Sequence, residues 1–178
     1  SIAALQSNEV DMLVQPIPPE QVDLLSMGGD IEVASGPLFT THMINYDMER
    51  APFNNLAVRQ AMSLAIDRQD LVDTVFLGAG TVGNAGWTHP ASVYYNDAVE
   101  TAYDAEQANA ILDEAGIVDS DGDGIRELDG EPLSVEFLAQ SNNSLRIRMA
   151  ELVREMLLEI GIDAQVVVLE ATTLDEAV

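Results

Sequence analysis

The stretch APFNNLAVRQAMSLAIDRQDLVDTVFLG, residues 51–78, decides the fold of this chain. Its apolar residues recur at intervals of three and four, which is the spacing of one face of an α-helix. They are Val58, Ala61, Met62, Ala65, Ile66, Val72, Val75 and Phe76, with Leu64 and Leu71 widening the face. Pro52 keeps Ala51 out of the helical region. Asn54 or Asn55 can cap the first free N–H groups, and Gly78 offers a left-handed stop. The pattern predicts one helix of about five turns lying on a core.

The chain before this helix is interpreted as short strands at residues 10–14, 31–34 and 41–46. A helical turn through residues 21–27 separates the first two strands. Residues 78–96, which come after the long helix, are rich in Gly and aromatic residues and are interpreted as a long ordered loop.

The second half of the chain predicts a βαβ unit. Asp104 is expected to cap a helix that Gly116 closes. A strand at residues 133–138, a helix of about four turns that Gly161 stops, and a strand at residues 164–169 then succeed one another with short connections. Such a unit, within residues 133–169, crosses over right-handed with its two strands parallel. The fold class is therefore α/β.

Composition indicates a globular protein with an acidic surface. The chain has 178 residues, 47% of them hydrophobic, which is enough for a core of its own. It carries 31 acidic residues against 7 basic ones, all arginine, for a formal net charge of −24. This field repels phosphate backbones and argues against nucleic acid as a partner. Two interpretations stay open: a surface that only maintains solubility, or adaptation to concentrated salt, which screens the self-repulsion.

The residues present do not assemble a catalytic or cofactor site. The chain has no cysteine, so disulfides, thiolate catalysis and zinc–thiolate sites are excluded. Residues 78–83 match G-x-G-x-x-G, but a helix precedes them and Gly86 and Pro90 prevent a helix after them, which is the wrong context for a dinucleotide. His42 and His89 have no Ser or Asp partner at a motif spacing. We expect a protein that is not an enzyme and has no cofactor.

An acidic loop gives the one candidate metal site. Asp119, Asp121 and Asp123 stand at positions 1, 3 and 5 of an EF-hand-type loop, and the carbonyl of Ile125 stands at position 7. The acid of position 12 is missing, because that place is Gly130. An Asp- and Gly-rich turn whose carboxylates cap backbone N–H groups explains the same residues and is favoured. Weak Ca²⁺ binding by residues 119–127 stays open, and with it a secreted Ca²⁺-binding structural domain as the alternative function.

Several motifs succeed one another in a recognisable order. They are Pro52-Phe53-Asn54, Val58-Arg59-Gln60-Ala61, Ala65-Ile66-Asp67-Arg68, Tyr103-Asp104 with Ala115-Gly116, Asp121-Gly-Asp-Gly124-Ile-Arg-Glu127, and Ile160-Gly161-Ile162. This series resembles the extracytoplasmic solute-binding proteins of ABC importers, specifically the dipeptide- and oligopeptide-binding family, family 5. The resemblance implies a type II periplasmic-binding-protein fold: two α/β lobes, each a mixed sheet flanked by helices, closing over the ligand by a hinge.

Members of that family are several times longer than one lobe, so the resemblance also implies that this chain is a fragment. Residues 1–35 would end the first lobe and cross the hinge, and residues 36–178 would form most of the second lobe. The implied function is a monomeric extracytoplasmic receptor, either periplasmic or a cell-surface lipoprotein. It would capture a solute, such as a peptide, and deliver it to ABC permease subunits at the membrane surface.

Ligand contacts in α/β proteins lie beyond the carboxyl ends of strands. After the strand at residues 133–138, this rule selects Gln140, Ser141, Asn142 and Asn143. In dipeptide-binding relatives a basic residue in this loop meets the ligand's carboxylate; here no Arg precedes Asn143, so neutral hydrogen bonding is expected. Trp87 and His89, in the Gly-rich loop, are further candidates. Trp87 would be either an aromatic wall or a core anchor.

Overall fold

The structure is a computed structural model that describes residues 2–14, 17–36, 38–99, 102–170 and 172–173. It divides into two compact units, Ser1–Pro37 and Leu38–Val178. In the first unit, α1 spans Ile2–Gln6 and α2 spans Pro19–Ser26, which agrees with the helical turn expected there. Within the described residues, no helix is long and apolar enough to cross a membrane.

The strands expected in the first unit do not form. Residues 10–14 and 31–34 carry no strand pairing where the structure describes them. A strand needs a partner to satisfy its backbone N–H and C=O groups, and apolar composition alone does not supply one. These two strand predictions are wrong.

Two helices replace the single long helix predicted for residues 51–78. α3 spans Leu56–Ala65 and α4 spans Arg68–Val75. Ile66 between them is extended (ψ 110°), and the Asp67 carboxylate accepts the N–H groups of Gln69 at 2.9 Å and Asp70 at 3.1 Å. Asp67 therefore begins a new helix by capping it, and the prediction of one continuous helix is wrong.

The ends predicted for this helical stretch are confirmed. The Asn55 side chain caps α3 by accepting the N–H of Ala57 at 2.9 Å. Gly78 lies in the left-handed region (φ 78°), after the end of α4. Both caps depend on local chemistry, which is why the sequence reveals them.

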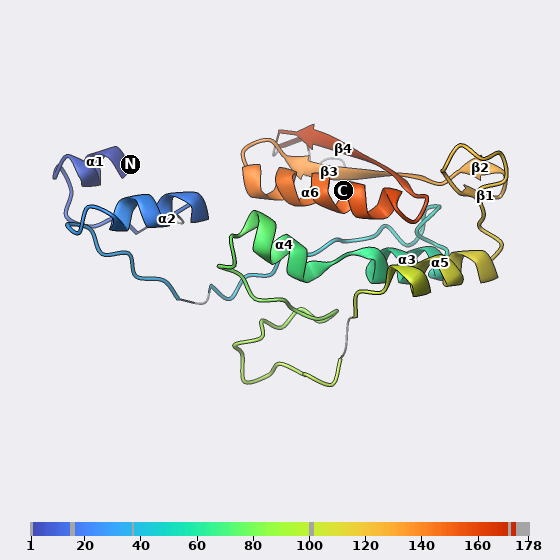
Figure 1. The fold of residues 1–178 in the computed structure, drawn as a ribbon, viewed down its shortest axis with the longest axis horizontal. Helices are drawn as coiled ribbons and strands as arrows, with labels where there is room; N and C mark the ends of the chain where they lie inside the picture. Colours follow the sequence, from blue (N-terminus) through green and yellow to red (C-terminus); the bar gives the residue numbers. More distant parts are fainter. Residues whose placement is uncertain (1, 15–16, 37, 100–101, 171, 174–178) are drawn as a thin grey trace. The chain divides into compact units, whose positions relative to one another are not determined.

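A third helix packs on α3 and builds the core with it. α5 spans Ala105–Glu114; its cap is Asp104, whose carboxylate accepts the N–H of Gln107 at 2.8 Å, and Gly116 (φ 74°) comes after its end, as predicted. The buried residues of the two helices are Val58, Ala61, Met62, Ala65, Ala108 and Leu112. α3 and α5 lie side by side in Figure 1.

The predicted βαβ unit is present. A short antiparallel hairpin comes first, with β1 at Glu127–Leu128 and β2 at Glu131–Pro132. Then β3 (Ser134–Gln140), α6 (Ser144–Leu158) and β4 (Asp163–Leu169) come in order, and β3 pairs with β4 in parallel (Figure 1). This unit confirms the α/β class, and Gly161 (φ 77°) turns the chain between α6 and β4 as predicted.

β3 and β4 turn one face toward α6. Along β3, Val135 and Ala139 are buried while Ser134 and Glu136 are exposed, which is the period of two that the sequence shows. α6 contacts both strands and contributes Val153 and Leu157, each buried. This face joins the core formed by α3 and α5.

No strand forms at residues 41–46, so that prediction is also wrong. The segment has no ladder partner, yet Ile44 and Tyr46 pack against the core. Their apolar side chains are used for packing rather than for a sheet. The strands of the described residues thus make two separate two-stranded sheets.

Candidate functional site

The β3–α6 loop is a short turn fixed to the structure at three points. The N–H of Ser141 donates to the carbonyl of Leu169 at the end of β4 (2.9 Å). The N–H of Asn143 donates to the carbonyl of Gln140 (3.1 Å). The Asn143 side chain in turn accepts the N–H of Arg146 (3.0 Å) and so caps α6. The loop therefore holds a defined shape at the carboxyl end of β3.

The four predicted ligand residues of this loop differ in what their side chains do. Ser141 and Asn142 are exposed, and Gln140 and Asn143 are half-buried. Among the described residues, the side chains of Gln140, Ser141 and Asn142 form no hydrogen bond, whereas that of Asn143 is engaged in the helix cap. Three polar side chains remain available to a ligand.

Trp87 and His89 lie elsewhere on the same unit. Trp87 is 78% exposed, so it is not a core anchor. The His89 ring stands 5.2 Å from that of Phe39, and its Nδ1 accepts the N–H of Ala91 at 3.0 Å. The yellow-green loop that carries both residues lies on the other side of α4 from the β3–α6 loop (Figure 1). The structure therefore does not bring Trp87 and His89 beside Gln140–Asn143.

His42 is the second histidine, and it is an exposed residue that lies against one aromatic ring. Its ring stands 5.5 Å from that of Phe76 at the end of α4. Partial desolvation of the ring lowers the pKa of His42, and the positive charge of Arg146 lowers it further. Both causes favour the neutral imidazole.

The acidic loop uses its carboxylates on its own backbone. Oxygen atoms of Asp119, Asp121 and Glu127 lie within 4.8 Å of one another, an arrangement that could face a cation. However, Asp119 accepts the N–H groups of Gly122 (2.7 Å) and Gly124 (2.9 Å). The carboxylates of Asp121, Asp123 and Glu127 likewise accept backbone N–H groups, from Asp123, Ile125 and Ser120. These bonds support the turn interpretation of the loop.

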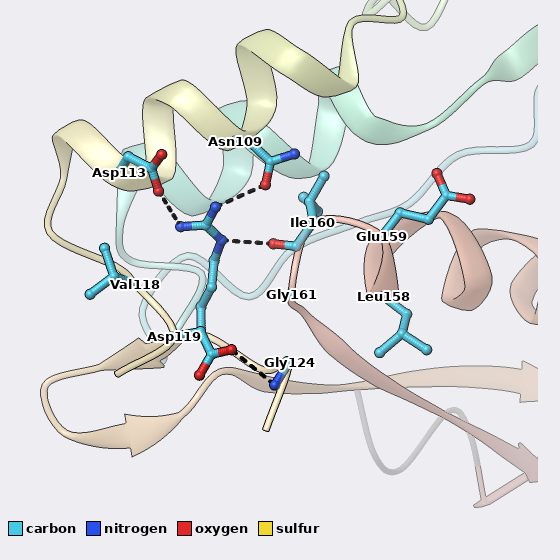
Figure 2. Close-up of a pocket in the computed structure, with 10 residues that line it drawn as sticks. Asn109, Asp113, Val118, Asp119, Gly124, Leu158, Glu159, Ile160 and Gly161 are labelled. Atoms are coloured by element: carbon cyan, nitrogen blue, oxygen red, sulfur yellow. Dashed lines mark hydrogen bonds and ion pairs between the residues drawn. The ribbon is translucent and has the colours of Figure 1, made fainter. Parts of the chain in front are cut away.

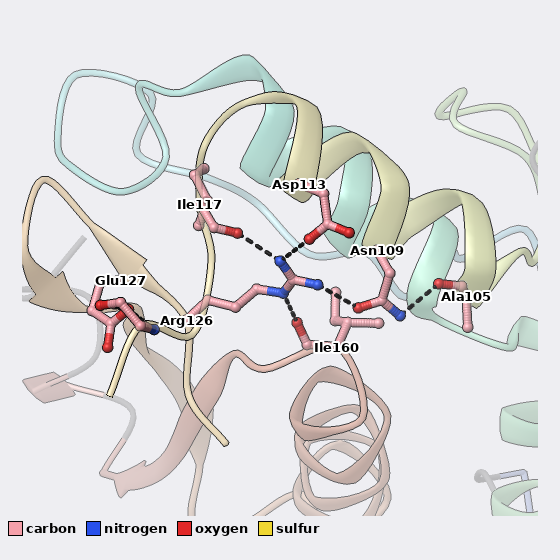
Figure 3. A network of polar contacts seen from close by, with 8 residues as sticks. Ala105, Asn109, Asp113, Ile117, Arg126, Glu127 and Ile160 are labelled. Carbon is pink, nitrogen blue, oxygen red and sulfur yellow. Dashed lines mark hydrogen bonds and ion pairs between the residues drawn. The ribbon is translucent and has the colours of Figure 1, made fainter. Parts of the chain in front are cut away.

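Arg126, at the end of this loop, ties three elements together, a role that the sequence does not indicate. Its Nε donates to the carbonyl of Ile160 (2.9 Å), at the end of α6. Its two terminal nitrogens reach Asp113 (2.6 Å), Asn109 (2.8 Å) and the carbonyl of Ile117 (2.6 Å), on or just after α5 (Figure 3). Only 12% of the Arg126 side chain is exposed. The network is structural, because each of the three guanidinium nitrogens already donates to an acceptor in the protein.

Neither of two shallow hollows on this unit is lined by the predicted solute-binding residues Gln140–Asn143, Trp87 or His89. The first lies beside the Arg126 network and is lined by Asn109, Asp113, Asp119 and Gly161 among others (Figure 2). The second runs along α6 and the start of β4, from Glu151 to Val166. The first is bordered by groups that already bond to one another.

The whole chain, residues 1–178, matches the model of the bacterial extracellular solute-binding proteins, family 5. The chain belongs to this family. It is 29% identical to the glutathione-binding protein GsiB of Escherichia coli over 95% of its length. It is 26% identical to the oligopeptide-binding protein AppA of Bacillus subtilis over 99% of its length. Over 71% of its length it is 31% identical to the nickel-binding periplasmic protein of Escherichia coli.

Solved structures show the same relationship. AppA from Bacillus subtilis, in complex with a nonapeptide, matches 98% of this chain with a TM-score of 0.83 and 27% identity. NikA from Brucella suis, in complex with Fe(III)-EDTA, matches 97% with a TM-score of 0.82 and 27% identity. The predicted type II binding-protein lobe is thereby confirmed.

The chain spans about a third of the length of these relatives: 30% of GsiB, 32% of AppA as a sequence and 34% of AppA as a structure. This agrees with the expectation of a fragment. The family is one of solute-binding proteins rather than enzymes, and none of these similarities supports the alternative of a Ca²⁺-binding structural domain.

Proposed function

We propose that this chain is part of a receptor that captures a small solute or peptide outside the cytoplasm and delivers it to the permease of an ABC importer, without catalysis. Residues 1–35 would end the first lobe and cross the hinge, and residues 36–178 would form most of the second. The family match over residues 1–178 supports this role. GsiB and AppA, which match nearly the whole chain, carry names that specify glutathione and oligopeptides.

One observation carries the placement of the site: unengaged polar side chains cluster at the carboxyl end of β3. The side chains of Gln140, Ser141 and Asn142 form no hydrogen bond within the described residues, on a loop that is itself firmly bonded. In α/β sheets, ligands bind beyond the carboxyl ends of strands. Uncharged amides and a hydroxyl favour hydrogen bonding to polar groups of a solute, such as the amides of a peptide.

Trp87 and His89 provide a second contact surface in this proposal. Trp87 exposes 78% of its area, and an exposed indole offers a flat apolar face with one donor. The loop that carries Trp87 and the β3–α6 loop lie on different sides of α4 (Figure 1), so the proposal treats them as two separate contact surfaces.

We also propose that the acidic composition suits a medium of concentrated salt. The chain has 31 acidic residues, only 7 arginines and no lysine, so few positive charges compensate its negative charge. Salt shortens the range of the resulting repulsion. Thermal unfolding at increasing NaCl concentration tests this proposal, and the melting temperature is expected to rise.

The test of the site uses the full-length protein and isothermal titration calorimetry with three probes: glutathione, a nonapeptide and Ni²⁺. Mass spectrometry of the purified protein under native conditions reports any solute that co-purifies. With the probe that binds, Gln140→Ala and Asn142→Ala are expected to lower affinity about tenfold each, since each removes one hydrogen bond to the ligand. Both variants should keep the melting temperature of the parent.

The matched control is Gln107→Ala, which removes an exposed amide from α5 instead. Its affinity should equal that of the parent. Unchanged affinity in both Gln140→Ala and Asn142→Ala would contradict the placement of the site. A protein that binds no probe and carries no co-purified solute would contradict the receptor role.

A further inference from the structure

We propose that Asn143 is a positioning residue: it sets the shape of the solute-binding loop through its two hydrogen bonds and does not itself contact the solute. This inference rests on the proposed function of the loop. It separates the four polar residues, Gln140, Ser141, Asn142 and Asn143, into those that meet a ligand and the one that arranges them.

Asn143 makes two of the three bonds that fix the loop. Its N–H closes a tight turn onto the carbonyl of Gln140 (3.1 Å). Its side-chain oxygen accepts the N–H of Arg146 (3.0 Å). The first bond shapes the turn that contains Ser141 and Asn142, and the second joins that turn to the first turn of α6. Both bonds act on the residues that would meet the ligand.

The engaged oxygen explains why Asn143 would not also serve as a ligand contact. Its backbone is non-helical (φ −123°, ψ 87°), as a capping residue requires. If its side-chain oxygen turned toward a solute, the N–H of Arg146 would lose its acceptor at the end of the helix. Asn142, one residue earlier, is exposed and has no such bond. The two neighbouring asparagines therefore have different roles.

The other helices of this unit show that the capping role is general. Asn55 caps α3, Asp67 caps α4 and Asp104 caps α5, each by accepting an N–H from the first turn. None of these three belongs to the proposed solute site. Asn143 does the same for α6, so its residue type is explained without a ligand. It differs from them because the residues just before it face the solute site.

The experiment measures affinity and melting temperature together in full-length protein, using the probe among glutathione, the nonapeptide and Ni²⁺ that binds the parent. Asn143→Ala removes the cap and is expected to weaken binding about tenfold while lowering the melting temperature by a few degrees. Asn143→Ser restores a capping oxygen but not the amide, and is expected to recover binding to within about threefold of the parent.

Each other outcome overturns the proposal. If Asn143→Ser restores the melting temperature but not the affinity, the amide itself touches the solute. If Asn143→Ala lowers the melting temperature and leaves affinity unchanged, the cap is structural only. If Gln140→Ala and Asn142→Ala leave affinity unchanged, the site itself is misplaced, and the proposed function of the loop fails with this inference. If those two variants lose affinity but Asn143→Ala does not, the positioning role of Asn143 fails while the proposed site stands.

Discussion

The surroundings of His42 lower its pKa. Partial desolvation of the ring, which lies beside Phe76, is the first cause, and the positive charge of Arg146 is the second. Arg146→Gln removes the second cause, so the pKa of His42 should rise toward the ordinary histidine value of 6.5 while staying below it because of the desolvation. Imidazole proton shifts followed by NMR during a pH titration measure this change. The control is Arg50→Gln, which removes an exposed arginine paired with Asp47 and should leave the pKa of His42 unchanged.

The direction of this shift sets how His42 affects stability. Since its pKa is lower in the folded than in the unfolded chain, the unfolded chain binds the proton more tightly. The contribution of His42 to stability is therefore present above about pH 6.5 and is lost as the pH falls through the folded-state pKa. In Arg146→Gln this loss should be smaller. An unchanged pKa would contradict the role given to Arg146.

Gly161 is needed for the close approach of Arg126. A Cβ at this position would stand 2.8 Å from Cγ of Arg126, and the backbone is left-handed (φ 77°). Gly161→Ala should lower the free energy of unfolding by about 1–2 kcal/mol for the backbone and about 1–3 kcal/mol more for displacing Arg126. Urea unfolding at equilibrium measures the loss.

Gly130 provides the matched control. It is also left-handed (φ 84°), but a Cβ there would meet nothing within 4 Å. Gly130→Ala should thus show the backbone cost alone, about 1–2 kcal/mol. Equal losses in the two variants would mean that the contact with Arg126 does not matter.

At the residue scale, the hydrogen bonds of Arg126 are of a kind that cannot be predicted from one sequence. It is part of the motif at residues 121–127 that contributes to the family resemblance. Its function depends on the carbonyl of Ile160, 34 residues away, and on α5. Such distant partners leave no spacing signal in one sequence. The bonds that Arg126 and the carboxylates make therefore give this motif a structural explanation.

At the scale of elements, the break between α3 and α4 escapes a prediction from periodicity because the apolar pattern continues across it. Ala65, Ile66 and Val75 are all buried, as one continuous helix would also require. The local signal is Asp67 with Asp70 three residues later, which marks a helix start. Arg68 then secures the break by donating to the carbonyls of Ser63 (3.0 Å) and Ile66 (3.2 Å).

The cap at Asp67 can be tested directly. Asp67→Ala leaves the N–H groups of Gln69 and Asp70 without their acceptor and should lower the free energy of unfolding by about 1 kcal/mol. Asp67→Asn keeps a side-chain oxygen and should retain most of that stability. Thermal and urea unfolding of both variants measure the difference. If Asp67→Ala unfolds like the parent, the break between α3 and α4 is held by tertiary packing and not by the cap.

Elements defined by local chemistry are predicted well from the sequence, and elements that need a partner are not. β3, α6 and β4 each have a periodic pattern, caps and stops that the sequence displays. The segments at residues 31–34 and 41–46 have apolar residues too, but no neighbouring strand pairs with them in the described part of the chain. Strand pairing is a long-range property, so composition overestimates it.

At the scale of the molecule, the fold could be predicted more completely than the site. The β3–α6 loop lies at the carboxyl end of β3 because the βαβ rule fixes it there. The distance between that loop and the loop carrying Trp87 depends on how α4 packs against α6. Periodicity reveals which face of a helix is buried, but not against which neighbour, and so the grouping of Trp87 with Gln140 could not be judged from sequence.

The net charge leads to a prediction about the whole molecule. Even if each of the 7 arginines neutralised one carboxylate, 24 of the 31 acidic residues would remain uncompensated (31 − 7 = 24). Folding brings these charges together, and their repulsion lowers the stability of the compact state. Its range falls as the Debye length drops from about 10 Å at 0.1 M salt to about 3 Å at 1 M. The melting temperature should therefore rise between 0.1 M and 1 M NaCl, which differential scanning calorimetry measures.

A charge variant separates screening from other effects of salt. Asp129→Asn, Glu131→Gln and Glu136→Gln together remove three exposed carboxylates that make no side-chain hydrogen bond or ion pair within the described residues. With less repulsion to screen, this variant should melt higher than the parent at 0.1 M NaCl and gain less on going to 1 M. If the melting temperature of the parent stays flat or falls with NaCl, the repulsion is too weak to affect folding. The acidic surface would then serve only to maintain solubility.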